Sequence, residues 1–224
     1  MEITHTVERE IDIPSWIVIE NHLDLDHIPH VHKRCYKYAS IITRYQRKDG
    51  YHVMLLELGA KPLTPLPLVI NYTMFHQFIP PNKIIHYSKP KNSKRWTKCE
   101  ITFYKKGDGK TVEIHNHILN LPIIFFPFKK WIIKIIRRWS DILWEEDSQI
   151  MRDRHEAVSK GFKDGLHCGK WTFKDGKTKF VFDDSAKEEN KISDTHFYQK
   201  DDKRNYRSSG NPWFFDSEIP PYNK

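Results

Sequence analysis

One short segment holds the residues that could do chemistry. Residues 20–32 read Glu-Asn-His-Leu-Asp-Leu-Asp-His-Ile-Pro-His-Val-His. Two of its imidazoles, His27 and His32, are five residues apart, and in a regular helix five residues turn about 500° and leave the side chains about 140° apart. Both rings can bind one ion only if the backbone departs from a regular helix. Pro29 lies between them and favours that departure, so the segment predicts part of a metal site.

Two neutral imidazoles and one carboxylate on one face of a metal leave several coordination positions open. This ligand set is typical of non-haem Fe(II) sites, which bind O2 beside a substrate. The carboxylate must come from another part of the chain. Glu145, Glu146 and Asp147 are adjacent in a later segment, and their residue types alone do not choose among them.

The order of these residues resembles the iron-binding motif of the catalytic domain of Rieske-type non-haem iron oxygenases. That motif reads EN-x-x-D-x-x-H-x-P-x-x-H, and its matches here are Glu20, Asn21, Asp24, His27, Pro29 and His32. In the family the third ligand is an aspartate near the start of the C-terminal helix, within W/F-x-E-D-x-x-I/V. The run WEEDSQI at residues 144–150 fits that pattern. The resemblance, over roughly residues 10–160, implies Fe(II) ligands at His27, His32 and Asp147.

The resemblance also implies an activity. It indicates an O2-dependent oxygenase that hydroxylates or oxidises the ring of a hydrophobic, aromatic or polycyclic substrate, with mono- or dioxygenation left open. The branch that it looks closest to acts on bulky hydrophobic compounds such as pheophorbide and sterols. Family members often form trimers, so a homo-oligomer also stays open.

One part of the family pattern is absent. Family members hold a [2Fe-2S] cluster in an N-terminal domain through CxH…CxxH, and this sequence contains no such pattern. Electrons must therefore arrive from a separate Rieske-type donor. By the resemblance, Asp24 is an electron-transfer bridge from an iron-ligand histidine to a cluster ligand of another subunit, and Asn21 supports the iron ligands. Asp24 could also simply cap a short helix, and His22 and His30 are expected to be exposed or to support the ligands.

The elements that must position these residues are mostly strands. Apolar and polar residues partly alternate over residues 2–13, as in a half-buried strand. Between residues 39 and 119 strand-like segments come in three pairs. The turn sequences that separate the paired segments are Lys-Asp-Gly at 48–50, Pro-Pro-Asn at 80–82 and Gly-Asp-Gly at 107–109. We expect an antiparallel sheet of about six or seven strands.

After Pro127 the apolar period changes from two to near 3.6, which predicts one long helix over residues 128–160 or two joined near Ser140. The combination predicts an α+β helix-grip fold of the Bet v1 or START kind, a curved antiparallel sheet around a long C-terminal helix with an apolar cavity between them. The competing hypothesis to an oxygenase is a helix-grip protein that binds lipids or small molecules without catalysis.

The chain divides near residue 167. Residues 1–167 are predicted to form the helix-grip catalytic domain, and residues 168–224 a charged C-terminal extension. Within the extension, residues 171–182 could form one hairpin. Residues 183–210 are too poor in apolar side chains to fold alone, so we expect disorder or extended wrapping there.

The formal net charge is +8, and its informative part is local. Residues 119–139 combine an apolar, aromatic run with five basic residues, Lys129, Lys130, Lys134, Arg137 and Arg138. Such a segment is typical of a helix on a membrane surface, but the same apolar face could instead pack in the core. No zinc-finger, RRM or recognition-helix pattern accompanies the cluster, so nucleic-acid binding is not expected.

The sequence also indicates a compartment. The three cysteines are far apart and form no CxxC pair, which favours a reducing environment. The N-terminal residues show no apolar leader, and no run reaches the roughly 18 apolar residues of a membrane span. We expect a cytoplasmic protein, with peripheral membrane contact as the open alternative.

Overall fold

The computed structural model describes residues 1–46, 52–61, 69–107, 109–160, 169–174, 177–182 and 221–223. The elements of the main body are, in chain order, β1 (Glu2–Ile11), α1 (Ser15–Leu23), η1 (Leu25–His27), α2 (Ile28–Val31), β2 (Tyr36–Gln46), β3 (His52–Ala60), β4 (Ile70–Ile79), β5 (Lys83–Pro90), β6 (Thr97–Lys105), β7 (Thr111–Asn120), η2 (Ile123–Phe128) and α3 (Lys129–Ser159). A hairpin of β8 (Gly169–Lys174) and β9 (Lys177–Phe182) follows.

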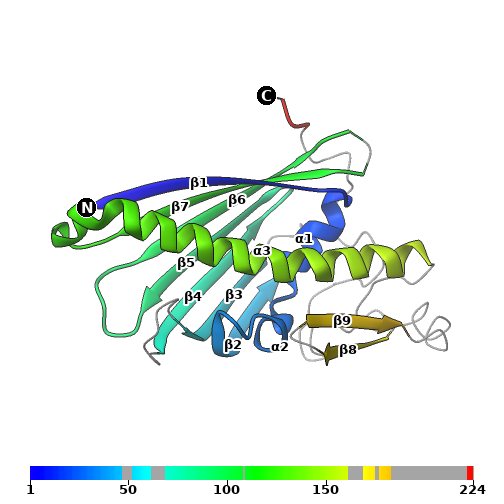
Figure 1. Cartoon of the computed structure of the whole chain (residues 1–224), viewed down its shortest axis with the longest axis horizontal. Helices are drawn as coiled ribbons and strands as arrows, with labels where there is room; N and C mark the ends of the chain where they lie inside the picture. The colour runs from blue at the N-terminus through cyan, green and yellow to red at the C-terminus, as the bar shows by residue number, and fades with distance from the viewer. Residues whose placement is uncertain are drawn as a thin grey trace.

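The seven strands form one antiparallel sheet in the order β1-β7-β6-β5-β4-β3-β2. Strands consecutive in the chain are neighbours from β2 to β7, and β1 adds beside β7. The segment α1-η1-α2 therefore carries the chain from one edge of the sheet to the other. In Figure 1 the sheet curves and α3 runs across its inner face. The helix-grip fold predicted from the sequence is confirmed, with α3 continuous through Ser140.

The spacing of apolar residues along the chain explains which side chains form the core. In β1 every fourth residue, Ile3, Val7 and Ile11, is buried. Helix α1 is buried on most of its surface because it lies between the sheet and α3. Its apolar side chains join one core cluster with Phe78, Phe103 and Met151. A second cluster lies at the other end of the sheet, around Leu56, Leu58 and Ile28.

The turns and the tail are described in part. Gly107 and Gly109 have φ angles of 61° and 76°, in the left-handed region that glycine adopts without strain. The turn predicted at residues 48–50 lies outside the described residues, as do the loop at 62–68 and the extension over 183–210. The hairpin predicted over 171–182 is present as β8 and β9.

The segment between β7 and α3 corrects one interpretation of the sequence. None of the residues of η2 is buried, and the side chains of Ile123, Ile124 and Phe126 are 78%, 70% and 60% exposed. Phe128 and Trp131 continue this surface at 56% and 58%. The alternative in which the whole apolar face packs in the core is therefore wrong for this stretch. No helix in the described part of the chain is both long and apolar enough to cross a membrane.

Candidate metal centre and its cavity

The segment that carries the two histidines is bent, as their spacing required. His27 ends the 3-10 turn η1, and His32 follows the single turn of α2. This change of helix type brings two rings that a regular helix would separate to within 3.2 Å, measured between their Nε2 atoms. Both rings are buried. Helix α3 crosses above them and supplies Asp147, which lies past the middle of the helix and not near its start.

The three side chains converge on one point. Oδ1 of Asp147 lies 3.3 Å from Nε2 of His27 and 3.1 Å from Nε2 of His32. A metal bound at about 2.1 Å to three donors at right angles would separate those donors by roughly 3 Å. The observed triangle therefore fits one face of an octahedral ion, and its donor set is two imidazoles and a carboxylate.

The protonation of the cluster is consistent with a cation site. Burial opposes ionisation of Asp147, but the rings of His32 and His27 hold its pKa well below the usual range. Burial lowers the pKa of His32, but the carboxylates of Asp147 and Glu146 outweigh burial and raise that pKa to about 9. Without an ion, the cluster therefore holds a proton. A bound metal would replace that proton, because imidazole binds a metal only in its neutral form.

Two side chains support the three candidate ligands. Oε2 of Glu146 lies 3.0 Å from Nδ1 of His32, so that nitrogen can donate its hydrogen to the carboxylate and leave Nε2 free to bind a metal. Nδ2 of Asn21 donates to Oδ1 of Asp147 at 3.4 Å, and its role in supporting an iron ligand stays a prediction. Glu145 points outward to Arg34, so Asp147 is the carboxylate of the three that meets both rings.

Asp24 occupies a different setting from the one its motif position implies. Its Oδ2 accepts a hydrogen bond from Nη2 of Arg154 at 3.0 Å, and both side chains are buried. It makes no side-chain cap to η1. The bridging role stays a prediction, and the structure adds a second role as the counterion of Arg154. Of the other two histidines, His30 is exposed and His22 is half-buried beside Glu113.

The candidate ligands face a cavity of about 450 Å³ between the sheet and α3. Its lining is largely apolar and comes from every layer of the fold. The apolar side chains in this lining include Leu25, Ile28, Leu58, Met74, Ile136 and Trp139. A cavity of this size and lining suits a hydrophobic small molecule.

The opposite wall holds polar groups that the sequence analysis treated only as strand residues. Glu113, His115 and His117 alternate along β7, so their side chains share the inner face. Cys99 on β6 lies directly opposite His117, and His86 on β5 directly opposite Cys99. Burial lowers the pKa of His86 to about 3, and burial together with His115 lowers that of His117 to about 4. The period-two run of Glu, His and His was the signal that could have revealed this wall.

Solved structures of other proteins share the fold of this chain, although their sequences differ widely from it. No protein-family model and no curated protein matches the sequence. The Zhui aromatase/cyclase from Streptomyces sp. R1128 aligns with a TM-score of 0.57 at 12% identity, over 70% of this chain and 98% of that chain. A Thermus thermophilus protein aligns with a TM-score of 0.52 at 14% identity, over 67% and 97%.

Dicamba monooxygenase bound to dicamba aligns with a TM-score of 0.55 at 13% identity, over 71% of this chain and 50% of that chain. This chain therefore spans about half the length of that enzyme. At such identities the likeness shows the fold alone. The chain is a helix-grip protein with a cavity between its sheet and α3, and the neighbours include both a monooxygenase and an aromatase/cyclase.

Proposed function

We propose that this chain is the catalytic domain of a Rieske-type non-haem iron oxygenase, with Fe(II) held by His27, His32 and Asp147. The observation that carries the proposal is the triangle of three donor atoms, 3.1–3.3 Å apart, formed by two segments more than 100 residues apart in the chain. Fe(II), when bound there, supplies the activation of O2. The motif that these residues match also supports the proposal.

The protein's own groups would prepare the reactants. Glu146 holds the ring of His32 in one orientation and one tautomer, so the metal site is arranged before the substrate enters. The apolar cavity would bind a hydrophobic or polycyclic substrate beside the site and exclude water. Electrons would come from a Rieske-type [2Fe-2S] donor, whose cluster motif these 224 residues do not contain. The position attacked and the number of oxygen atoms inserted are set by a substrate still to be identified.

Iron content tests the proposal directly. Protein reconstituted with Fe(II) without oxygen should retain about one equivalent of iron per chain after gel filtration, and His27→Ala should retain far less. His30→Ala is the matched control, because His30 belongs to the same segment but is exposed, and it should retain iron like the parent protein. If the parent holds no iron, or if His27→Ala holds as much as the parent, the chain is instead a helix-grip protein that binds small molecules without oxidation.

We also propose that the exposed segment around η2 rests on an anionic membrane surface. The apolar side chains of Ile123, Ile124, Phe126, Phe128 and Trp131 are more than half exposed. Next to them on α3 stand five exposed basic residues, Lys129, Lys130, Lys134, Arg137 and Arg138. At a membrane surface the apolar side chains would enter the lipid interface and the basic side chains would meet the anionic headgroups. Such a surface suits this segment better than water does.

The membrane surface would adjoin the cavity. The cavity is lined by Leu119 near the end of β7 and by Ile135, Ile136 and Trp139 on α3. The exposed segment lies between β7 and this part of α3 along the chain. A hydrophobic substrate could therefore pass from the bilayer to the metal site without crossing bulk water. This arrangement links the membrane proposal to the oxygenase proposal, although each can fail alone.

Flotation with vesicles tests the membrane proposal. The protein should float with phosphatidylcholine vesicles that contain phosphatidylglycerol, and less with phosphatidylcholine alone. Each basic residue near an anionic surface contributes about 1 kcal/mol, so the double change Lys129→Gln and Lys130→Gln should weaken binding roughly 30-fold.

Two further variants separate lipid insertion from self-association of the chain. Phe126→Ser should also reduce flotation, whereas Phe75→Ser, which alters an exposed phenylalanine on β4, should not. Failure to float with anionic vesicles would overturn the proposal. So would self-association that Phe126→Ser abolishes, since the segment would then be a contact between copies of the chain.

A further inference from the structure

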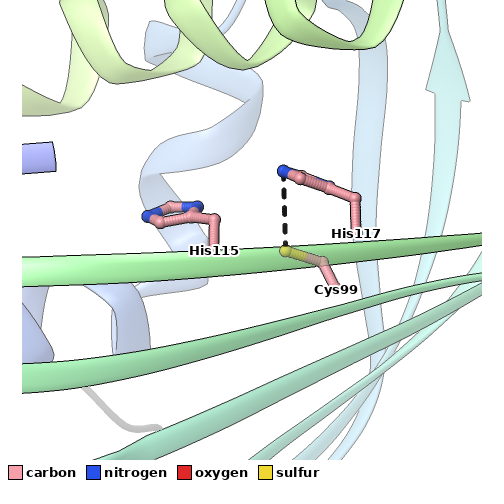
Figure 2. Close-up of side chains that lie close together, drawn as sticks. All are labelled: Cys99, His115 and His117. Carbon is pink, nitrogen blue, oxygen red and sulfur yellow. Dashed lines mark hydrogen bonds between the residues drawn. The ribbon is translucent and has the colours of Figure 1, made fainter. Parts of the chain in front are cut away.

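A second cluster of metal-binding side chains lies on the sheet wall of the same cavity. Register places Cys99 on β6 directly opposite His117 on β7, so both side chains project from the same face of the sheet. His115, two residues earlier in β7, projects from that face too. Donor atoms of the three residues all lie within 4.8 Å of one another. Figure 2 shows the three side chains grouped above the strands.

The separations suit a tetrahedral ion. The Sγ atom of Cys99 lies 4.0 Å from Nε2 of His117. A tetrahedral ion with bonds of about 2.3 Å to sulfur and about 2.05 Å to nitrogen would place these atoms roughly 3.6 Å apart. Small rotations of the two side chains would close that difference. All three residues are half-buried and line the cavity, so they are screened from bulk solvent but accessible to a small ion.

A buried carboxylate orients the third donor. Oε2 of Glu113 lies 2.6 Å from Nε2 of His115, and the Glu113 side chain has no exposed surface. If that nitrogen donates its hydrogen to the carboxylate, Nδ1 of His115 keeps its lone pair. In Figure 2 one ring nitrogen of His115 lies on the side of Cys99 and His117, and the other lies on the far side. Carboxylate, imidazole and metal in this order recur in zinc sites, where the carboxylate fixes the tautomer.

We propose that Cys99, His115 and His117 bind a thiolate-preferring divalent ion of the zinc kind, at a site separate from that of His27, His32 and Asp147. Thiolate and imidazole ligands select zinc, whereas a carboxylate with two imidazoles is the set that suits iron. Three protein ligands leave a fourth position for a ligand from the cavity, as in catalytic zinc sites. That position would take the oxygen of a carbonyl, carboxylate or hydroxyl group on the cavity's ligand. The site does not depend on the oxygenase proposal.

Cobalt(II) distinguishes the two sites, because a thiolate ligand gives a charge-transfer band in the near ultraviolet and a set of two imidazoles and a carboxylate does not. Metal-free protein, kept reduced with a phosphine, would be titrated with Co(II) and followed by absorption and metal analysis. We expect two equivalents to bind, one of them with the band. Asp147→Asn should lose one equivalent and keep the band.

Substitutions at the second site give the decisive comparison. Cys99→Ser should remove the band and its equivalent, while Cys35→Ser, at a buried cysteine elsewhere, and Cys168→Ser should keep both. Glu113→Gln should weaken the band-forming site about 10- to 100-fold, as for other residues that orient a ligand. Circular dichroism of each variant checks folding, and His117→Gln repeats the test without altering a cysteine. Absence of the band in the parent protein, or its persistence in Cys99→Ser, would overturn the proposal.

Discussion

Replacing Asp147 by asparagine should lower the affinity for Fe(II) by on the order of 100-fold or more. Changing a residue that only orients a metal ligand costs about 10- to 100-fold in affinity, and we propose Asp147 as a ligand itself. Its Oδ1 is within 3.3 Å of Nε2 of both imidazoles, and its charge would partly offset that of a bound ion. Equilibrium dialysis without oxygen, followed by iron analysis, measures the change.

The neighbouring acids provide matched controls for Asp147. Glu145→Gln should leave the affinity unchanged, because that side chain is 72% exposed and paired with Arg34. Glu146→Gln should weaken binding about tenfold through the orientation of His32. If Asp147→Asn binds iron like the parent and Glu146→Gln does not, the carboxylate ligand has been assigned to the wrong residue.

The second large effect is on stability. Arg154→Met should lower the free energy of unfolding by about 3–5 kcal/mol, because it removes the guanidinium that pairs with the buried carboxylate of Asp24. The two side chains are 1% and 4% exposed, so solvent cannot replace the lost partner. Urea unfolding of the metal-free protein, monitored by tryptophan fluorescence, gives the value.

A double-mutant cycle isolates the pair. Combining Arg154→Met with Asp24→Asn should recover part of the loss, since neither side chain of the pair then carries a charge. Arg152→Met, at an exposed position of α3, should change stability by less than about 0.5 kcal/mol. Equal losses in the single and double variants would show that the pair is not what holds these segments together.

Local pattern accounted for most of the fold. Alternation along the strands predicted a sheet of about six or seven strands, and the 3.6 period after Pro127 predicted one long helix or two, because each element must bury one face. The bent segment was also predictable, since two histidines five residues apart cannot meet on a regular helix. The choice of Asp147 over Glu146 needed the motif, because adjacent residues on a helix differ by about 100° in direction.

Contacts between distant strands and helices were beyond the sequence. The pairing of Asp24 with Arg154 joins residues 130 positions apart, and neither residue's type indicates the other. Glu146 was considered only as a ligand, and its approach to the outer nitrogen of His32 depends on how α3 lies over α2. Strand register, which sets Cys99 opposite His117, is likewise a property of the assembled sheet. The apolar period around residue 131 could not indicate whether that face of the helix packs in the core or is exposed.

The segment that crosses from β1 to β2 would couple metal binding to the stability of the fold. The residues that cross, 12–35, join the two edge strands of the sheet, and His27 and His32 lie in the second half of this crossing segment. An ion shared with Asp147 would fasten the crossing segment to α3. Free metal at about 100 times its dissociation constant would then add about 2.7 kcal/mol to the free energy of unfolding. In a cell short of metal, a larger fraction of the protein would be unfolded and open to proteolysis.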